Sequence, residues 1–217
     1  MDSYRRPPIE SPIFRDEDGT PIAYGRRWDG GDPPPESYSR TSHLDRFRPL
    51  HEVAEALIAH LVEEYAVAVD DGPDLASDMV HPRDDVVRAI RITPADAAAA
   101  PLTFVFTSFP SVILHAGALH DFLFPVCGCD ACDEDVDYLA GDLEWHVQAV
   151  VDGGYREHVV PSSGHGVAFS LSVPGVGTQS GSVRADDLPR EAVAAALAAL
   201  PPDGRWAPWP RRAASAS

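Results

Sequence analysis

The chain of 217 residues carries a formal net charge of −17 and contains no lysine, so that all 17 of its basic residues are arginines. Nucleic acids and anionic membranes are bound by clustered basic side chains, whereas the arginines here are scattered or paired, so neither is expected as a partner. No apolar stretch approaches the roughly 20 residues that cross a bilayer, whereas a hydrophobic fraction of 44% is enough for a packed core.

Residues 1–42 are predicted to form an extended arm, and residues 43–217 a single α+β domain. The arm is rich in proline and shows neither the period of a helix nor that of a strand, but it carries aromatic residues such as Tyr24 and Trp28 at intervals. We expect residues 20–42 to lay these aromatics on the domain, and the first dozen residues to be disordered.

A first helix is predicted to begin near Pro49, since proline suits the first helical turn. Apolar residues then recur at helical spacing from Leu50 to Tyr65, with glutamates off that stripe. The sequence Asp70-Asp71-Gly72-Pro73 is a strong stop signal, so the helix should end before it.

Three strand-like runs follow, over residues 85–93, 102–108 and 111–124. The third is predicted to be a hairpin that turns about Gly117-Ala118, because glycine suits the first central position of a type II′ turn. In that register His115 would face His120, and the two histidines would lie side by side on one face of the sheet.

A second helix is predicted over residues 133–151, whose first turns hold acidic residues that the helix dipole favours. Strands are expected over residues 155–160 and 166–173, while residues 175–184 could form another strand or a loop. A last, alanine-rich helix is predicted over residues 189–200.

The C-terminal segment holds two tryptophans, Trp206 and Trp209, spaced by prolines, and we expect it to dock on the domain as an extended clip. Together these elements predict an α+β fold. It should comprise an antiparallel sheet of about five or six strands, about three helices packed on that sheet, and the extended N-terminal arm.

Three cysteines, Cys127, Cys129 and Cys132, lie between the predicted hairpin and the second helix with the spacing C-x-C-x-x-C. The N-terminal sequence lacks the apolar core of a signal peptide, so we expect a cytoplasmic protein. In that reducing compartment, clustered cysteines indicate metal ligation or redox chemistry rather than a structural disulfide framework.

A zinc ion bound to the three thiolates needs a fourth ligand to complete its tetrahedron. His120 is the first choice and His115 the second, because the hairpin brings both close to the cysteine segment in the sequence. Carboxylates of Asp130 or Asp133, or a water molecule in an open position, are the alternatives.

Two other interpretations of the cysteines stay open. The pair Cys129-Asp-Ala-Cys132 at a helix start is typical of redox-active thiols, although the surrounding acids disfavour a thiolate. Alternatively, the cysteines pack as small apolar residues. Because nearby acids help to bind a cation and hinder a free thiolate, the charge pattern favours the metal.

Several strings in the chain resemble a family of actinobacterial proteins known as a domain of unknown function. The most specific is the run from Phe124 to Glu134, which reads F-P-x-C-G-C-D-A-C-D-E with valine in the variable position, and the ending Trp206-Ala207-Pro208-Trp209-Pro210 is another. The resemblance implies a cytoplasmic bacterial protein and carries no activity, substrate or catalytic residue.

Two functional hypotheses follow from the sequence. The first is a binding or interaction module with a zinc-stabilised cysteine loop, whose acidic charge suits a protein partner with a basic surface. The second is a small enzyme that uses a zinc-bound water or a reactive thiol, which requires an open ligand position or an exposed cysteine in a pocket lined by His115, His120 and acids.

Overall fold

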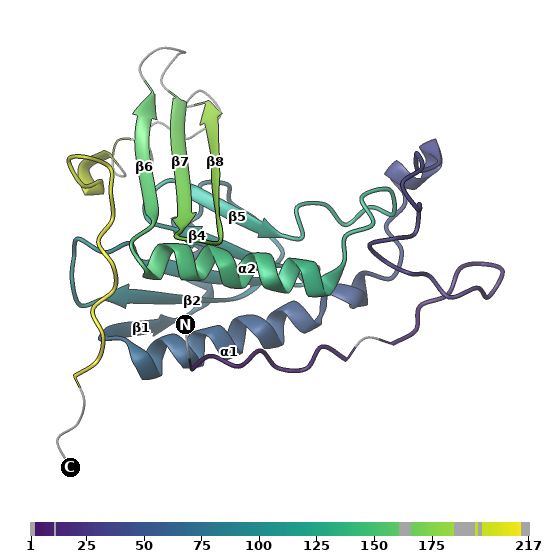
Figure 1. Cartoon of the computed structure of the whole chain (residues 1–217), viewed down its shortest axis with the longest axis horizontal. Coiled ribbons are helices and arrows are strands. Elements are labelled where there is room, and N and C mark those ends of the chain that lie inside the picture. The colour runs from purple at the N-terminus through teal and green to yellow at the C-terminus, as the bar shows by residue number, and fades with distance from the viewer. Residues whose placement is uncertain (1–2, 11, 161–165, 185–193, 195–196, 214–217) are drawn as a thin grey trace.

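The computed structural model describes residues 3–10, 12–160, 166–184, 194 and 197–213. It confirms the α+β class, and it divides the strands between two antiparallel sheets rather than one (Figure 1). The larger sheet holds, in spatial order, β1 (Val67–Asp71), β2 (Val86–Pro94), β3 (Leu102–Thr107), β4 (Val112–Ala116) and β5 (His120–Phe124). The smaller sheet holds β6 (Tyr155–Val160), β7 (Gly166–Val173) and β8 (Gly177–Arg184). Residues 175–184, for which either a strand or a loop was predicted, therefore contain a strand.

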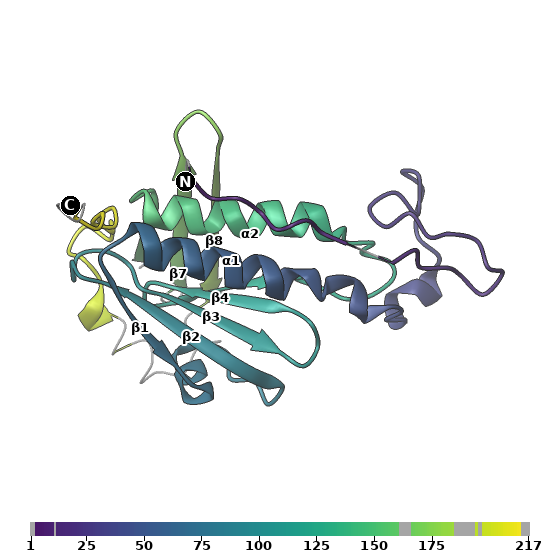
Figure 2. The same ribbon diagram turned by 90° about the horizontal axis from the view of Figure 1, so that it is seen from below.

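Two α-helices, α1 (Pro49–Glu64) and α2 (Val136–Val151), lie side by side on one face of the larger sheet (Figure 2). Their apolar stripes and the facing strand residues form the main core, which includes the fully buried Leu50, Leu57, Phe104, Leu114 and Leu143. Burial of each such side chain stabilises the fold by about 1.5–3 kcal/mol.

The opposite face of the larger sheet is covered in part by the 3-10 helix η3 (Pro73–Asp78) and the residues after it. Met79 packs there against Ala89, Val105 and Ile113. Every residue of β3 and β4 is buried, because these central strands are covered on both faces. Their near-continuous apolar sequence is therefore a consequence of two-sided burial.

The edge strand β1 was not predicted from the sequence. Helix α1 ends at Glu64, well before the acidic stop signal, and the chain then pairs residue by residue with β2. The last four residues of β1 are exposed, so they lack the apolar alternation by which a half-buried strand is recognised.

The hairpin between β4 and β5 has a three-residue connection, Gly117 to Leu119, and not the predicted two-residue turn. Ala116 pairs with His120, and His115 pairs with Asp121. His115 and His120 therefore project from opposite faces of the sheet, since a shift of one residue in register moves a side chain to the other face. The predicted pairing of the two histidines is wrong.

Helix α2 begins at Val136, three residues later than predicted. Asp135 caps it, because its side chain accepts a hydrogen bond of 2.9 Å from the Tyr138 backbone N–H. The last predicted helix, over residues 189–200, lies largely outside the described residues.

The C-terminal clip docks on the body as expected, and both of its tryptophans are 4% exposed. The Trp209 ring packs edge-on against Tyr65 at 5.8 Å, and its Nε1 donates to the Ala100 carbonyl at 2.8 Å. The Trp206 Nε1 donates to the carboxylate of Glu157 in β6 at 2.9 Å. Residues 206–209 thus join the smaller sheet to the main core.

The N-terminal arm follows the helices and contains the short 3-10 helix η1 (Pro35–Ser39), and a second one, η2 (Leu44–Phe47), lies between the arm and α1 (Figure 2). Within the first dozen residues, for which the sequence predicts disorder, the Tyr4 hydroxyl donates to Glu144 of α2 at 2.9 Å and Arg6 donates to the same carboxylate. In the part of the chain that is described, no helix combines the length and the apolar character needed to cross a membrane.

Candidate metal centre

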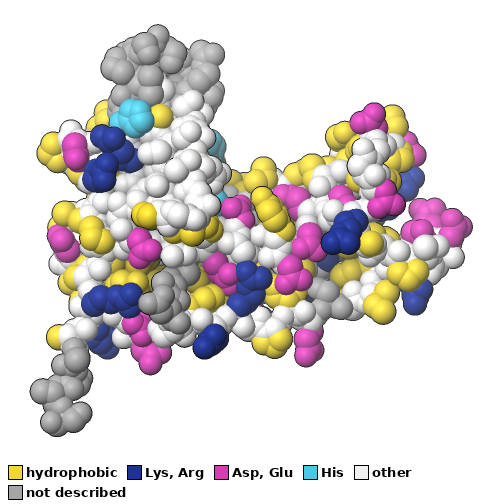
Figure 3. All heavy atoms as spheres, in the orientation of Figure 1, with side chains coloured by type: hydrophobic (Ala, Val, Ile, Leu, Met, Phe, Trp, Pro, Cys, Tyr) yellow, Lys and Arg dark blue, Asp and Glu magenta, His cyan; other side chains and the backbone are white. Residues whose placement is uncertain are grey.

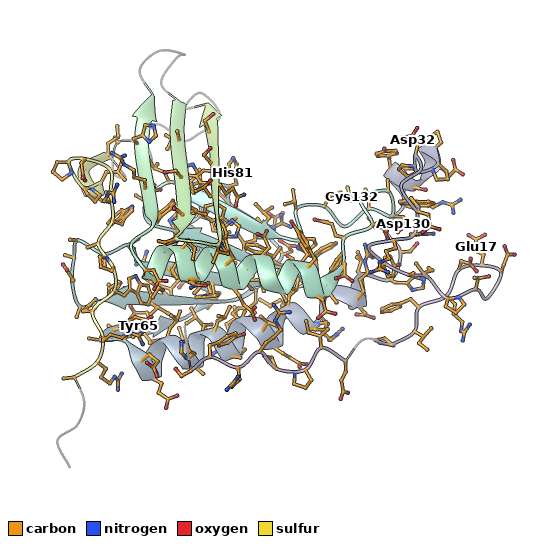
Figure 4. The ribbon with its side chains drawn as sticks, in the orientation of Figure 1. Glu17, Asp32, Tyr65, His81, Asp130 and Cys132 are labelled. Atoms are coloured by element: carbon orange, nitrogen blue, oxygen red, sulfur yellow. The ribbon has the colours of Figure 1, made fainter. Side chains whose placement is uncertain are left out.

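The three cysteines occupy the loop that connects β5 to α2, where the loop meets the N-terminal arm. Figure 4 shows Cys132 and Asp130 together at this junction, beside the arm segment that carries Asp32. The sulfur atoms of Cys127, Cys129 and Cys132 all lie within 4.8 Å of one another. The predicted convergence of the three thiols is therefore present in the fold.

The thiols differ in their exposure and in their contacts. Cys129 is 7% exposed, Cys127 is half-buried and Cys132 is exposed. The Cys129 backbone N–H donates to the Cys127 Sγ at 3.4 Å, and the Sγ atoms of Cys129 and Cys132 lie 3.5 Å apart, within hydrogen-bond reach. The cluster thus has a buried side and a side that faces solvent at Cys132.

The pKa values of two thiols move in opposite directions. Burial raises the pKa of Cys129, but hydrogen bonds from the Cys132 backbone, from the Cys127 and Cys132 thiols and from the Ala131 backbone together lower it below its ordinary value. Burial and hydrogen bonds with the neighbouring thiols raise the pKa of Cys132 to about 12. In the absence of a cation, the cluster therefore holds one negative charge more readily than two.

The loop backbone is shaped by a glutamate and a glycine. The Glu134 carboxylate accepts hydrogen bonds from the backbone N–H groups of Val126 at 3.3 Å and Cys127 at 3.1 Å. Gly128 packs against Phe109, and a Cβ at this position would lie 2.4 Å from the Phe109 Cζ. The glycine between the first two cysteines is thus required by the close approach of the ring.

The acids beside the cysteines bind the arm. Asp130 accepts hydrogen bonds of 2.8 Å from both the backbone N–H and the hydroxyl of Ser42, and one of its oxygens lies 3.5 Å from the Arg27 guanidinium. The Oδ2 of Asp133 accepts from the Arg27 backbone N–H at 2.8 Å. Both carboxylates, considered from the sequence as oxygen ligands, thus lie between the cysteine loop and the arm.

A buried arginine completes this junction. Arg46 is 2% exposed, and it donates to the carbonyl groups of Ser42 and Gly128. Its guanidinium also lies 4.3 Å from the centre of the Tyr24 ring and 4.1 Å from that of Phe47. Burial lowers the pKa of Arg46, while Tyr24 and the nearby acids favour its charged form. One side chain therefore connects the arm, η2 and the cysteine loop.

We expect Arg46→Met to lower the free energy of unfolding by about 1–3 kcal/mol, because buried carbonyl groups lose their donors while the side-chain volume is kept. The arm should also become susceptible to proteolysis between residues 15 and 45. Urea unfolding and limited proteolysis measure the two effects. The matched control is Arg48→Met, since Arg48 is exposed and its guanidinium forms a surface ion pair of 2.8 Å with Asp45. Equal behaviour of the two variants would contradict the role of Arg46.

The two predicted histidine ligands lie elsewhere in the fold. His115 Nδ1 is 2.7 Å from the Asp121 Oδ1, and His120 Nδ1 is 3.2 Å from the Glu157 Oε1. Over the described residues, the group of side chains arranged to hold a metal ion consists of the three cysteines. The structure thus brings the cysteines together and leaves both histidines out of the cluster.

Comparison with known protein families identifies the family to which the chain belongs. A family model described as a family of unknown function, DUF6226, matches residues 10–213. The chain belongs to DUF6226. No curated protein and no solved structure matches the DUF6226 chain. Membership confirms the resemblance to a family of unknown function and leaves the function to be argued from the site.

The arm residues of this DUF6226 site were not identified from the sequence. Arg27, Ser42 and Arg46 lie about 80–100 residues before the cysteines, and nothing in their local pattern indicates a shared junction. One signal was available for Glu157, which lies two residues after the buried Tyr155 and therefore on the same face of a strand of period two. A carboxylate on a buried face needs donors around it.

Proposed function

We propose that Cys127, Cys129 and Cys132 bind one zinc ion and that the metal-stabilised loop is the centre of a protein-binding module. The observation that carries the proposal is the convergence of three thiols within 4.8 Å on a loop whose backbone N–H at Cys127 is bound by the Glu134 carboxylate. Cysteine thiolates are preferred ligands of zinc, and three of them provide most of a tetrahedral site.

The surroundings of the thiols favour a bound cation. Asp130, Asp133 and Glu134 lie within the same loop, and their negative charges oppose the ionisation of several neighbouring thiols. A divalent ion reverses this effect, because it stabilises the thiolates and is itself attracted by the acids. The fourth ligand is then a water molecule or a group from a partner, on the solvent side of Cys132.

The metal would fix the loop against the arm and so shape a surface for a partner. Beside Cys132 lies a hollow of about 490 Å³, whose lining includes three acids, Asp133, Glu134 and Asp135, and one basic residue, Arg26. Asp133 is 8% exposed, and its Oδ1 has no hydrogen-bond partner within the described structure. An acidic hollow with a free buried carboxylate oxygen suits an arginine or lysine side chain of a basic protein partner.

The test is the metal content of the full chain, measured by mass spectrometry with a parallel thiol titration, on protein purified without chelator or affinity metal. We expect one zinc per chain and thiols protected from titration, both lost in Cys129→Ser. His115→Gln and His120→Gln are the controls and should keep the metal, because neither side chain belongs to the cluster.

If the purified protein contains no metal and all three thiols titrate freely, the proposed zinc site is wrong. Loss of zinc in His120→Gln, with the fold intact, would instead restore that histidine as the fourth ligand. The first result tests whether the cysteines bind zinc, and the second tests the identity of the fourth ligand. Both are obtained from the same protein samples.

A second candidate function is supported by one distance, the 3.5 Å between the sulfurs of Cys129 and Cys132. Two thiols this close can form a disulfide, giving up two protons and two electrons to an oxidant such as a small-molecule disulfide. In this case the metal-free protein would lose two titratable thiols on mild oxidation, recover them on reduction, and show the corresponding change in intact mass. Metal-free protein that keeps all three titratable thiols and an unchanged intact mass under the same oxidant would exclude it.

A further inference from the structure

A separate cavity of about 240 Å³ lies where the smaller sheet meets β5 and α2. Figure 3 shows this side of the molecule, hollowed at the angle between the upright three-stranded sheet and the rest of the chain. His81, labelled in Figure 4 beside that sheet, belongs to the lining. The cavity is larger than the roughly 150 Å³ that holds a benzene molecule, so a single ring with a substituent fits it.

The wall of the cavity is mainly apolar and aromatic. Its apolar contributions include Leu119, Phe122, Phe124, Val126 and Phe169. The Phe122 and Phe169 rings are in edge-to-face contact with a centroid distance of 5.0 Å. Such a wall favours a flat, ring-containing ligand, because aromatic rings pack well edge-to-face or offset-stacked.

One buried polar atom of this wall lacks a partner. His120 is 4% exposed, and its Nε2 makes no hydrogen bond within the described structure. Its other ring nitrogen, Nδ1, lies 3.2 Å from the Glu157 Oε1. A buried nitrogen without a partner costs free energy, and a ligand that supplies a hydrogen bond removes that cost.

The surroundings of Glu157 determine what His120 offers. The same carboxylate also accepts from the backbone N–H groups of Ala118 at 3.0 Å and Leu119 at 2.8 Å, and from the Trp206 indole at 2.9 Å. Because the carboxylate acts as the acceptor throughout, the His120 proton is on Nδ1. In the neutral ring, Nε2 is then a hydrogen-bond acceptor directed by the glutamate behind it.

A second histidine in the wall is held in the same tautomer. His146 is 2% exposed, and its Nδ1 lies 2.7 Å from the Asp142 carbonyl oxygen, which can only accept. Asp142 itself also lines the cavity. In this tautomer both histidines present an acceptor. His81 and Gln179 also line the cavity and can donate, but the carboxylates of Asp121 and Asp142 in the lining disfavour an anion by like charge.

We propose that this cavity is a binding site for a small ring-containing molecule that carries a hydroxyl or N–H donor, and that His120 Nε2 accepts the hydrogen bond. The site does not depend on the zinc proposal, since His120 lies outside the cysteine cluster. It is a pocket for neutral or cationic ligands, in which Glu157 positions the histidine and the phenylalanines hold the ring.

The experiment compares phenol, toluene and benzoate as probes of the full chain by NMR titration, with the ring nitrogen signals of His120 as a readout. Phenol should bind roughly three- to tenfold more tightly than toluene, which has the same ring without a donor. Phenol should also shift the Nε2 signal, and benzoate should bind more weakly than phenol.

Two variants locate the binding. Gln179→Trp places a large side chain at the exposed cavity mouth and should abolish phenol binding, whereas Thr178→Trp, its neighbour on β8 outside the lining, should not. His120→Phe should remove the preference for phenol over toluene. Equal affinities for phenol and toluene, no saturable binding of phenol, or binding that survives Gln179→Trp would each overturn the proposal, even if His120→Phe fails to fold.

Discussion

Replacing Glu157 by glutamine is expected to lower the free energy of unfolding by about 3 kcal/mol, and so the melting temperature by roughly 5–15 °C. Glu157 is fully buried, and each of its oxygens accepts two hydrogen bonds. A glutamine side chain has one carbonyl oxygen. Its amide group would turn two N–H donors towards two donors of the protein, which leaves buried polar groups unpaired.

Thermal and urea unfolding of the parent protein and of Glu157→Gln measure this loss of stability. Glu63→Gln is the control, since Glu63 is exposed on α1 and its substitution should stay within about 0.5 kcal/mol of the parent. If Glu157→Gln unfolded at the same urea concentration as the control, the carboxylate would not organise the junction between the β4–β5 turn, β6 and the C-terminal clip.

A loss of about 3–5 kcal/mol in the free energy of unfolding is expected for Trp209→Ala. The ring is 4% exposed and packs on Tyr65, and its removal would leave a cavity and a buried Ala100 carbonyl without its donor. The backbone N–H of residue 209 would still donate to the Val151 carbonyl, so the loss is assigned to the side chain.

Tyr138→Ala is the matched control for this second variant, because it removes an aromatic ring that is 73% exposed. Its free energy of unfolding should change little. A Trp209→Ala protein as stable as Tyr138→Ala would show that the C-terminal clip contributes nothing to the core. Denaturant unfolding followed by circular dichroism is sufficient for the comparison.

The elements with a strong local pattern were predictable from the sequence. The stripe from Leu50 along α1 and the apolar runs of β3 and β4 each indicate one structure, since burial imposes a period or a continuous apolar run. The edge strand β1 and the division into two sheets were not predictable. Both depend on which distant strand forms hydrogen bonds with the segment, and the sequence of the segment alone does not determine that partner.

The candidate metal centre was predictable only in its local part. The spacing of the cysteines determines that their thiols can meet, because a few residues of loop connect them. The fourth ligand was inferred from the closeness of His115 and His120 to the cysteines in the sequence, which does not determine where their side chains lie. The predicted hairpin register is wrong by one residue, and the two histidines project from opposite faces of the sheet. The arm contacts of Asp130 and Asp133 join segments far apart in the chain and have no local signature.

The long sequence separation between the arm and its loop has a consequence for synthesis on the ribosome. The Trp28 indole donates to the Asp130 carbonyl, 102 residues further along the chain. At a translation rate of 5–20 residues per second, the arm emerges roughly 5–20 s before its docking loop exists. During that interval its aromatic side chains are not yet covered by the loop, and the flanking charges of Arg26, Arg27 and Asp29 oppose aggregation of the segment.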